Sequence, residues 1–264
     1  MKIRYAEQKD IPELKSLWKV CFGDSDEYID NFFECLFDAK NTIVAKIDKR
    51  VAGVTYMIPA KLKECDFMYG YAIGVLPEFR GQSLCKKMLE FIKDLAETED
   101  FIFGLHPANE KLEQFYQKIG LKPMYSLKEV VLDENLPDAE CEISDITAEE
   151  IVKMRKNHFP ELVEWDENVI DFIKENNQRV KKITLQQKSA YFFIRKEAET
   201  VVIYETSADD SFIKTSSSCI KEKFDAKNIK YILSSKTTLQ GIEKPCIYGF
   251  SDANDGVYMN LFLD

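Results

Sequence analysis

The turn formed by residues 77–85 holds the side chains best placed to do chemistry. It follows an apolar run that ends at Leu76 and precedes a helical pattern. The first N–H groups of a helix have no intrahelical partner and the helix dipole is positive there, so this position suits a bound anion. Arg80 adds a fixed positive charge, and Gly81 lets a ligand approach the backbone. The pattern indicates a phosphate-binding turn.

Two strand–helix pairs must position this turn. The first is a strand over residues 68–75 and a helix with apolar residues at helical spacing, namely Leu84, Met88, Phe91, Ile92 and Leu95. The second is a strand over residues 101–105 and a helix over residues 109–119. Asn109 is the expected N-cap of that helix, and Gly120 is its expected stop. Upstream, residues 10–22 and 25–37 predict helices with aromatic core faces, and residues 41–62 predict a β-hairpin.

This order of elements resembles the GNAT superfamily of acyl-CoA-dependent N-acetyltransferases over roughly residues 1–133. The family's pyrophosphate turn reads Arg/Gln-x-x-Gly-x-Gly/Ala, and here Arg80 matches while Ser83 and Cys85 replace the two small positions. The Ser83 N–H remains and its hydroxyl can bond a phosphate oxygen, so we interpret the turn as modified rather than abolished. The resemblance implies an α/β (α+β) fold with a mixed central β-sheet flanked by helices.

The resemblance also implies acetyl-CoA as co-substrate, held between two splayed central strands without a metal. Backbone groups of the first splayed strand would pair with the pantetheine arm, and the turn would bind the pyrophosphate. Carried over, these positions are Ile73, Gly74 and Val75, then Arg80, Gly81, Gln82, Ser83, Leu84 and Cys85. Gly74 would admit a ligand, although a packing glycine explains it equally well. Asn109 would contact the pantetheine arm as well as cap its helix.

Tyr116 matches the family's usual proton donor to the departing CoA sulfur, because a phenol can protonate a thiolate as it forms. The general base stays open between His106, a water molecule and the C-terminal carboxylate of Asp264, which has a counterpart in Eis-like enzymes. The leading hypothesis is an N-acetyltransferase that acts on a primary amine of a small molecule or peptide. A catalytically weak acyl-CoA-binding or regulatory module is the alternative, and an aminoacyl-tRNA donor is a third.

The composition of the chain limits the classes of ligand and partner that we expect. The chain has 264 residues and a net charge of −10, which argues against a nucleic-acid partner and mildly favours a cationic substrate. The seven cysteines show no C-x-x-C spacing and there are two histidines, so we expect reduced, buried thiols rather than a metal site or disulfides. No long apolar segment or leader pattern occurs near the start, so we expect no membrane span and a cytoplasmic protein.

The second half repeats the element order of the first. A polar stretch at residues 133–139 predicts a boundary between a GNAT domain at 1–135 and a degenerate GNAT-like domain at 140–264. In the second domain the corresponding turn carries Asp209 and Asp210, which would repel a pyrophosphate. This domain is expected to complete the substrate cleft or form a homo-oligomer interface. The tandem is similar to that of Eis-like acetyltransferases without their extra C-terminal domain.

Overall fold

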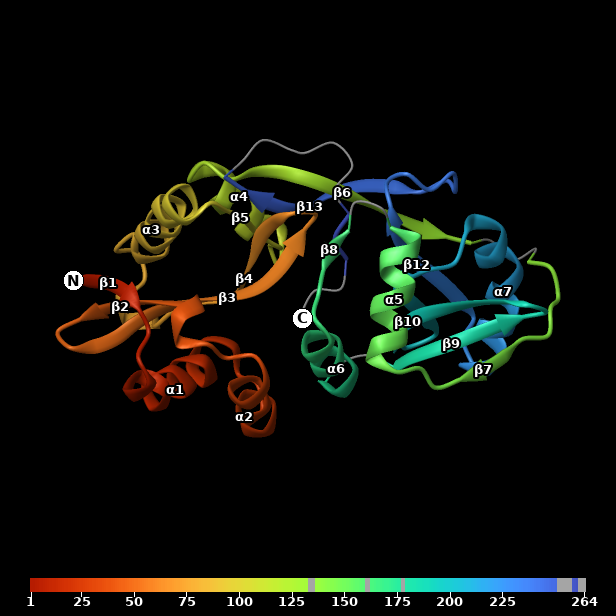
Figure 1. Ribbon diagram of the computed structural model, residues 1–264, viewed down its shortest axis with the longest axis horizontal. Helices are drawn as coiled ribbons and strands as arrows, with labels where there is room; N and C mark the ends of the chain where they lie inside the picture. Colours follow the sequence, from red (N-terminus) through yellow and green to blue (C-terminus); the bar gives the residue numbers. More distant parts are fainter. Residues whose placement is uncertain (133–135, 160–161, 177–178, 251–257, 261–264) are drawn as a thin grey trace. The chain divides into compact units, whose positions relative to one another are not determined.

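The chain forms two compact units in the computed structural model, which describes residues 1–132, 136–159, 162–176, 179–250 and 258–260 (Figure 1). Unit 1 comprises residues 1–124 and 247–254, and unit 2 comprises residues 125–246 and 255–264. The chain passes between the units within strands β6 (Lys122–Val131) and β13 (Ile242–Gly249). The boundary predicted at residues 133–139 includes residues 133–135, which lie outside the described residues. Within the described ranges, no helix is long and apolar enough to cross a membrane.

Unit 1 is built on a mixed sheet in the order β1-β2-β3-β4-β5, with the end of β13 beside β5. Strands β4 and β5 are parallel, and the other neighbours are antiparallel. The mixed sheet predicted for this half is therefore confirmed. Its strands are β1 (Lys2–Tyr5), β2 (Thr42–Ile47), β3 (Arg50–Leu62), β4 (Cys65–Val75) and β5 (Phe101–Leu105).

The hairpin predicted from β2 to β3 is confirmed. Asp48 and Lys49 form its tip with φ of 48° and 69°, as a two-residue turn between twisted strands requires. Strand β4 begins at Cys65, earlier than the predicted residue 68, because the chain already reverses at Lys63, where φ is 55°. The extra residues pair with β3, from Leu62 opposite Cys65 onward.

Helices cover both faces of the unit 1 sheet. Helices α1 (Ile11–Phe22) and α2 (Asp26–Cys35) lie on one face, and α3 (Leu84–Glu99) lies on the other (Figure 1). Helix α4 (Glu110–Lys118) shares a hydrophobic cluster with α3. Short 3-10 turns occupy residues 8–10, 39–41 and 77–79. Ser25 caps α2 by accepting a hydrogen bond from the Tyr28 N–H, but the helix ends before the predicted residue 37.

The aromatic residues of α1 and α2 form core, as predicted. The Trp18 ring lies 4.6 Å from that of Phe32 and 5.1 Å from that of Tyr56 on β3, centroid to centroid. Trp18 and Phe32 are 1% and 0% exposed. Each such side chain contributes roughly 1.5–3 kcal/mol through burial, so this cluster fixes both helices against the sheet.

In unit 2 the strands follow the order β6-β12-β11-β10-β9-β7, in which β11 and β12 are parallel and the other neighbours are antiparallel. Its remaining strands are β7 (Glu142–Ser144), β8 (Val163–Glu164), β9 (Arg179–Leu185), β10 (Lys188–Glu197), β11 (Thr200–Thr206) and β12 (Asn228–Ser234). Its helices are α5 (Ala148–His158), α6 (Glu167–Asn176) and α7 (Asp210–Lys223). A strand followed by a helix and a parallel strand recurs here, as the sequence predicted.

Helix α7 begins directly after Asp209. Asp209 caps it by accepting a hydrogen bond from the Phe212 N–H at 2.7 Å. The serine-rich middle of α7, residues 215–218, carries little helical propensity of its own. Side-chain burial stabilises the helix instead, because Phe212, Ile213 and Ile220 pack in the main hydrophobic cluster of the unit.

The opposite face of the unit 2 sheet contains a buried ion pair. The Arg155 guanidinium on α5 donates from Nε to Glu205 Oε1 on β11 at 2.8 Å and from a terminal nitrogen to Oε2 at 3.3 Å. The Tyr191 hydroxyl donates to the same Glu205 carboxylate at 2.6 Å. The Arg155 and Glu205 side chains are 1% and 0% exposed, so the network links helix and sheet through charges removed from water.

We expect Arg155→Met to destabilise the protein by about 3–5 kcal/mol, because it leaves the Glu205 carboxylate buried without its cation. Urea unfolding followed by circular dichroism measures the loss. The double variant Arg155→Met/Glu205→Gln is the control, since it removes both charges and should recover part of the stability. A loss below about 1 kcal/mol in the single variant would show that water reaches the carboxylate.

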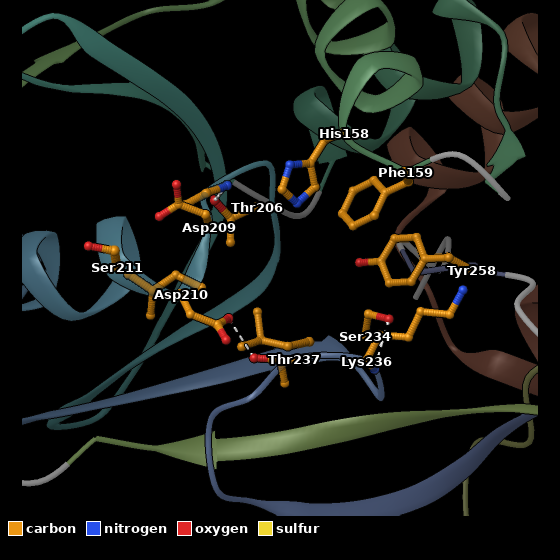
Figure 2. Close-up of a pocket in the computed structure, with 13 residues that line it drawn as sticks. His158, Phe159, Thr206, Asp209, Asp210, Ser211, Ser234, Lys236, Thr237 and Tyr258 are labelled. Atoms are coloured by element: carbon orange, nitrogen blue, oxygen red, sulfur yellow. Dashed lines mark hydrogen bonds between the residues drawn. The ribbon is translucent and has the colours of Figure 1, made fainter.

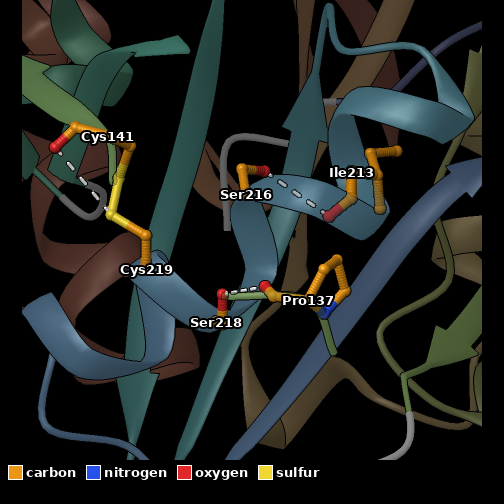
Figure 3. The surroundings of a disulfide bond; sticks show 6 residues. All are labelled: Pro137, Cys141, Ile213, Ser216, Ser218 and Cys219. Atoms are coloured by element: carbon orange, nitrogen blue, oxygen red, sulfur yellow. Dashed lines mark hydrogen bonds between the residues drawn. A yellow bond between two sulfur atoms is a disulfide. The ribbon is translucent and has the colours of Figure 1, made fainter. Parts of the chain in front are cut away.

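The expectation of reduced, buried cysteines is corrected. Cys141 and Cys219 form a disulfide that ties the segment before β7 to helix α7, with Cα atoms 6.2 Å apart (Figure 3). The neighbouring Ser218 hydroxyl donates to the Pro137 carbonyl at 2.6 Å and anchors the same segment. Cys35 and Cys65 are exposed rather than buried. Sequence spacing missed the pair because its partners are 78 residues apart and meet only in the fold.

Candidate active site

Strands β4 and β5 separate at one end of the unit 1 sheet. Their parallel pairing runs from Asp66 opposite Phe101 to Gly70 opposite Leu105, where β5 ends. Strand β4 continues to Val75, so beyond Gly70 the edge that faced β5 has no strand partner among the described residues. An extended ligand can pair with such an edge through backbone hydrogen bonds.

A β-bulge redirects the free part of β4. Val54 lies opposite Gly74 and Tyr56 lies opposite Tyr71, so Thr55 faces two residues of β4. Ala72, inside this bulge, has a φ of 45°. A bulge bends its strand and increases its twist. The predicted ligand-pairing residues Ile73, Gly74 and Val75 all follow the bulge.

The predicted phosphate turn connects β4 to α3. A 3-10 turn at Pro77–Phe79 leads into it, and Arg80 Nε donates to the Val75 carbonyl at 3.0 Å. Gly81 and Ser83 have φ of 77° and 59°, so the backbone winds through the left-handed region before the helix begins. Gly81 meets this need without strain, whereas Ser83 adopts a conformation that is uncommon for residues with a side chain.

The N-terminus of α3 is open. Ser83 is the N-cap residue, but its hydroxyl accepts no capping hydrogen bond from the described chain. The first turn of α3 carries no acidic residue. Arg80, Gly81, Gln82 and Ser83 are all exposed. The first amides of α3 therefore point their unpaired N–H groups and the positive end of the helix dipole toward solvent, where an anion can bind.

Gly74 allows helix α1 to pack closely against strand β4. A Cβ built there would lie 3.0 Å from Leu17 Cδ2 and 3.3 Å from Cys21 Sγ, both on α1. The face of β4 at this residue is thus filled by α1. A ligand would reach Gly74 through backbone groups at the strand edge and not through the space of its missing side chain.

Tyr116 on α4, Cys85 on α3 and Ile73 on β4 belong to one hydrophobic cluster. Tyr116 is 6% exposed, and burial raises the pKa of its phenol well above the usual value, with the nearby Cys85 thiol adding to the shift. Burial also raises the pKa of Cys85 to about 12. Both groups are therefore protonated at neutral pH. The Tyr116 hydroxyl makes no hydrogen bond with the described residues, so its proton can be given to a ligand.

Two further predicted residues, His106 and Asn109, follow the end of β5 in the chain. Asn109 caps α4 by accepting a hydrogen bond from the Leu112 N–H at 3.1 Å, as the sequence predicted. His106 directly follows β5. Asp264 lies outside the described residues.

Comparison with known proteins identifies the first unit. Residues 2–124 match the model of the acetyltransferase (GNAT) domain. The first unit is a GNAT domain. This confirms the resemblance seen in the sequence for the matched part of the chain. No curated protein matches the sequence.

Several solved GNAT structures share the fold over both units. A GCN5-related N-acetyltransferase from Anabaena variabilis is similar over 94% of this chain and 71% of its own, at 14% identity and a TM-score of 0.71. A conserved protein from Enterococcus faecalis described as a probable N-acyltransferase covers 94% and 72%, at 12% identity and a TM-score of 0.73. Eis1 from Mycobacterium abscessus covers 94% and 73%, at 10% identity and a TM-score of 0.68. At identities this low, the structural similarity establishes the fold alone.

Sequence reasoning missed one residue of the GNAT unit. Tyr248 on β13 lies opposite Leu105, is 1% exposed and belongs to the same cluster as Tyr116. Its hydroxyl donates to the Glu113 carboxylate on α4 and thereby holds the helix that carries Tyr116. Tyr248 follows Glu113 by 135 residues, so no local pattern could connect them.

Unit 2 has two parallel strands, β11 and β12, that correspond to β4 and β5, but the gap between them is filled. Strands β11 and β12 pair from Thr200 opposite Asn228 to Ile203 opposite Tyr231, and no register pair is described beyond that point. There the Asn260 amide donates to the Ile232 carbonyl at 3.0 Å and to the Tyr204 carbonyl. Asn260 is 1% exposed and fills the gap between the two strands. The space where a pantetheine arm would pair is taken by the chain itself.

Proposed function

We propose that the protein is an acetyl-CoA-dependent N-acetyltransferase whose acceptor is a primary amine of a small molecule or peptide. The open N-terminus of α3 beside the free edge of β4 carries this proposal. A diphosphate fits the first amides of α3, and an extended pantetheine arm fits the edge at residues 73–75. Unit 2, which has the same strands but a closed turn, is assigned no cofactor.

The reaction needs an amine, a thioester and a proton for the leaving group. The amine nitrogen attacks the thioester carbonyl carbon, the C–N bond forms, the C–S bond breaks, and the sulfur leaves with the electron pair. Tyr116 gives its proton to that sulfur. Its raised pKa keeps the phenol protonated at neutral pH, so the proton is in place when negative charge develops on the sulfur. The amine loses a proton to His106 or to water, and Asp264 remains a further candidate.

The acceptor is assigned by charge. The chain carries 46 acidic and 36 basic residues, which favours approach of a cation over that of a nucleic acid. We place the reaction in the cytoplasm, where acetyl-CoA and amines are both available.

Acetyl-CoA is expected to raise the thermal unfolding temperature of the protein well above the value found with equimolar ATP, because ligand at 100 times its Kd stabilises by about 2.7 kcal/mol. Release of free thiol, measured across a panel of primary amines, then tests turnover. Stabilisation without thiol release for any amine would favour the regulatory module. Equal shifts of the unfolding temperature with ATP and with acetyl-CoA would contradict both the enzyme and the regulatory-module hypotheses.

A further inference from the structure

Unit 2 contains a cavity of about 550 Å³ that the acetyltransferase chemistry does not use. It lies at the ends of β11 and β12, beside the first turn of α7 and the end of α5 (Figure 2). Its volume falls within the usual range of small-molecule sites. Thirteen residues line it, all from unit 2, and they include His158, Phe159, Asp210, Lys236 and Tyr258.

The α7 side of the cavity is closed to anions. The Asp209 carboxylate caps α7 through the Phe212 N–H. The Asp210 carboxylate accepts hydrogen bonds from the Thr237 hydroxyl at 2.6 Å and the Thr238 N–H at 2.8 Å. These bonds lower the pKa of Asp210 below its ordinary value, against the effect of desolvation, so the group is ionised at neutral pH. The helix terminus that binds phosphate in other proteins is here already neutralised.

The opposite side of the cavity is aromatic. The Phe159 and Tyr258 rings stack with centroids 3.9 Å apart and planes inclined by 18°. The His158 ring meets Phe159 edge-on at 4.5 Å. Desolvation lowers the pKa of His158, so its imidazole is neutral at pH 7. The exposed Lys236 is a cation on the lining. Outside the lining, Lys188 Nζ lies 3.8 Å from an Asp209 carboxylate oxygen, in an exposed ion pair that contributes little to stability.

We propose that this cavity binds an organic ammonium ligand with an apolar or aromatic body. The Asp210 carboxylate attracts the ammonium group, and the Phe159–Tyr258 stack receives the body and contributes cation–π attraction. Ile213 and Leu233 complete the apolar lining. Every lining residue belongs to unit 2, and the proposal does not depend on acetyl transfer.

Three probes with one phenyl ring and different charge test the ligand class on the full-length protein without acetyl-CoA. They are 2-phenylethylamine, 2-phenylethanol and 3-phenylpropanoate, compared by isothermal titration calorimetry. The amine is expected to bind at least about tenfold more tightly than the alcohol, and the propanoate least tightly. Tightest binding of the propanoate, or no binding of the amine at millimolar concentration, overturns the proposal.

Variants assign the binding to this cavity. Asp210→Asn removes the charge, yet an amide can still accept from Thr238 and donate to the Thr237 hydroxyl, so the turn should fold. It is expected to weaken amine binding by about tenfold and leave alcohol binding unchanged. Asp225→Asn is the matched control, because Asp225 lies outside the cavity in an exposed pair with Lys196. Unchanged amine affinity in Asp210→Asn refutes the assignment.

A second variant keeps the test decisive if Asp210→Asn unfolds. Phe159→Leu preserves an apolar side chain but removes the ring that stacks on Tyr258. It is expected to reduce the preference for the amine over the alcohol by about three- to tenfold. An unchanged preference would show that the aromatic wall does not contact the ammonium group and would also overturn the proposal.

Discussion

Tyr116→Phe is expected to lower kcat about 10²–10⁴-fold while leaving acetyl-CoA affinity nearly unchanged. The phenol is the proton donor assigned to the departing sulfur, and proton transfer by a positioned side chain contributes this much. The hydroxyl makes no hydrogen bond with the described residues, so its removal costs little stability. Steady-state kinetics with the best amine of the panel, together with calorimetric titration of acetyl-CoA, measures both quantities.

The pH profile sharpens this test. Burial raises the pKa of Tyr116 well above its ordinary value. The wild-type kcat should therefore show no fall between pH 8 and about 10 from loss of this proton. Tyr5→Phe is the matched control, since the Tyr5 hydroxyl only donates to the exposed Glu99 at 2.9 Å. Wild-type kcat in Tyr116→Phe, or equal losses in both variants, would remove Tyr116 from the mechanism.

Ser83→Asp is expected to weaken acetyl-CoA binding roughly 100-fold, because it brings a carboxylate to the amides that would hold the diphosphate. The change copies unit 2, where Asp209 and Asp210 already close the start of α7. Aspartate tolerates the left-handed backbone at this position better than most residues, so the turn should keep its shape. Calorimetric titration with acetyl-CoA measures the affinity.

Ser83→Asn separates charge from size. Asparagine matches aspartate in volume and tolerates the same φ of 59°. We expect Ser83→Asn to lose less than about tenfold in affinity. If both variants bind as the wild type does, the diphosphate does not lie at this helix. If both variants lose affinity equally, the size of the side chain at position 83 limits binding at this turn, and the charge argument is wrong.

Sequence patterns predicted the local elements of the GNAT domain well. The strand at residues 101–105 was predicted with its observed limits, and Asn109 was identified as the N-cap of α4. These features depend on neighbouring residues, such as apolar runs, side chains that bond their own backbone, and glycine after a helix. The motif around Arg80 was recognisable for the same reason, because all its residues are contiguous.

Features that depend on distant residues were not predictable. The Cys141–Cys219 disulfide, the Arg155–Glu205 pair and the Asn260 bridge each join segments that meet only after folding. The role of Asn260 follows from carbonyl groups left unpaired where β11 and β12 separate. The length of α7 also depends on tertiary burial, which outweighs the weak helix propensity of its serines.

The return of the chain to unit 1 at β13 limits how the protein can be divided. A fragment that ended at Met124 would lose Tyr248 and Gly249, which pair with Leu105 and Gly104 on β5. That strand would then expose a row of bare amide and carbonyl groups, and such an edge recruits other copies into swapped dimers or aggregates. Unit 1, the half of the protein that holds the GNAT domain, is therefore not expected to fold as an excised fragment. Its last strand is supplied by residues synthesised some 140 positions after β5, so folding of this half must wait for nearly the whole polypeptide.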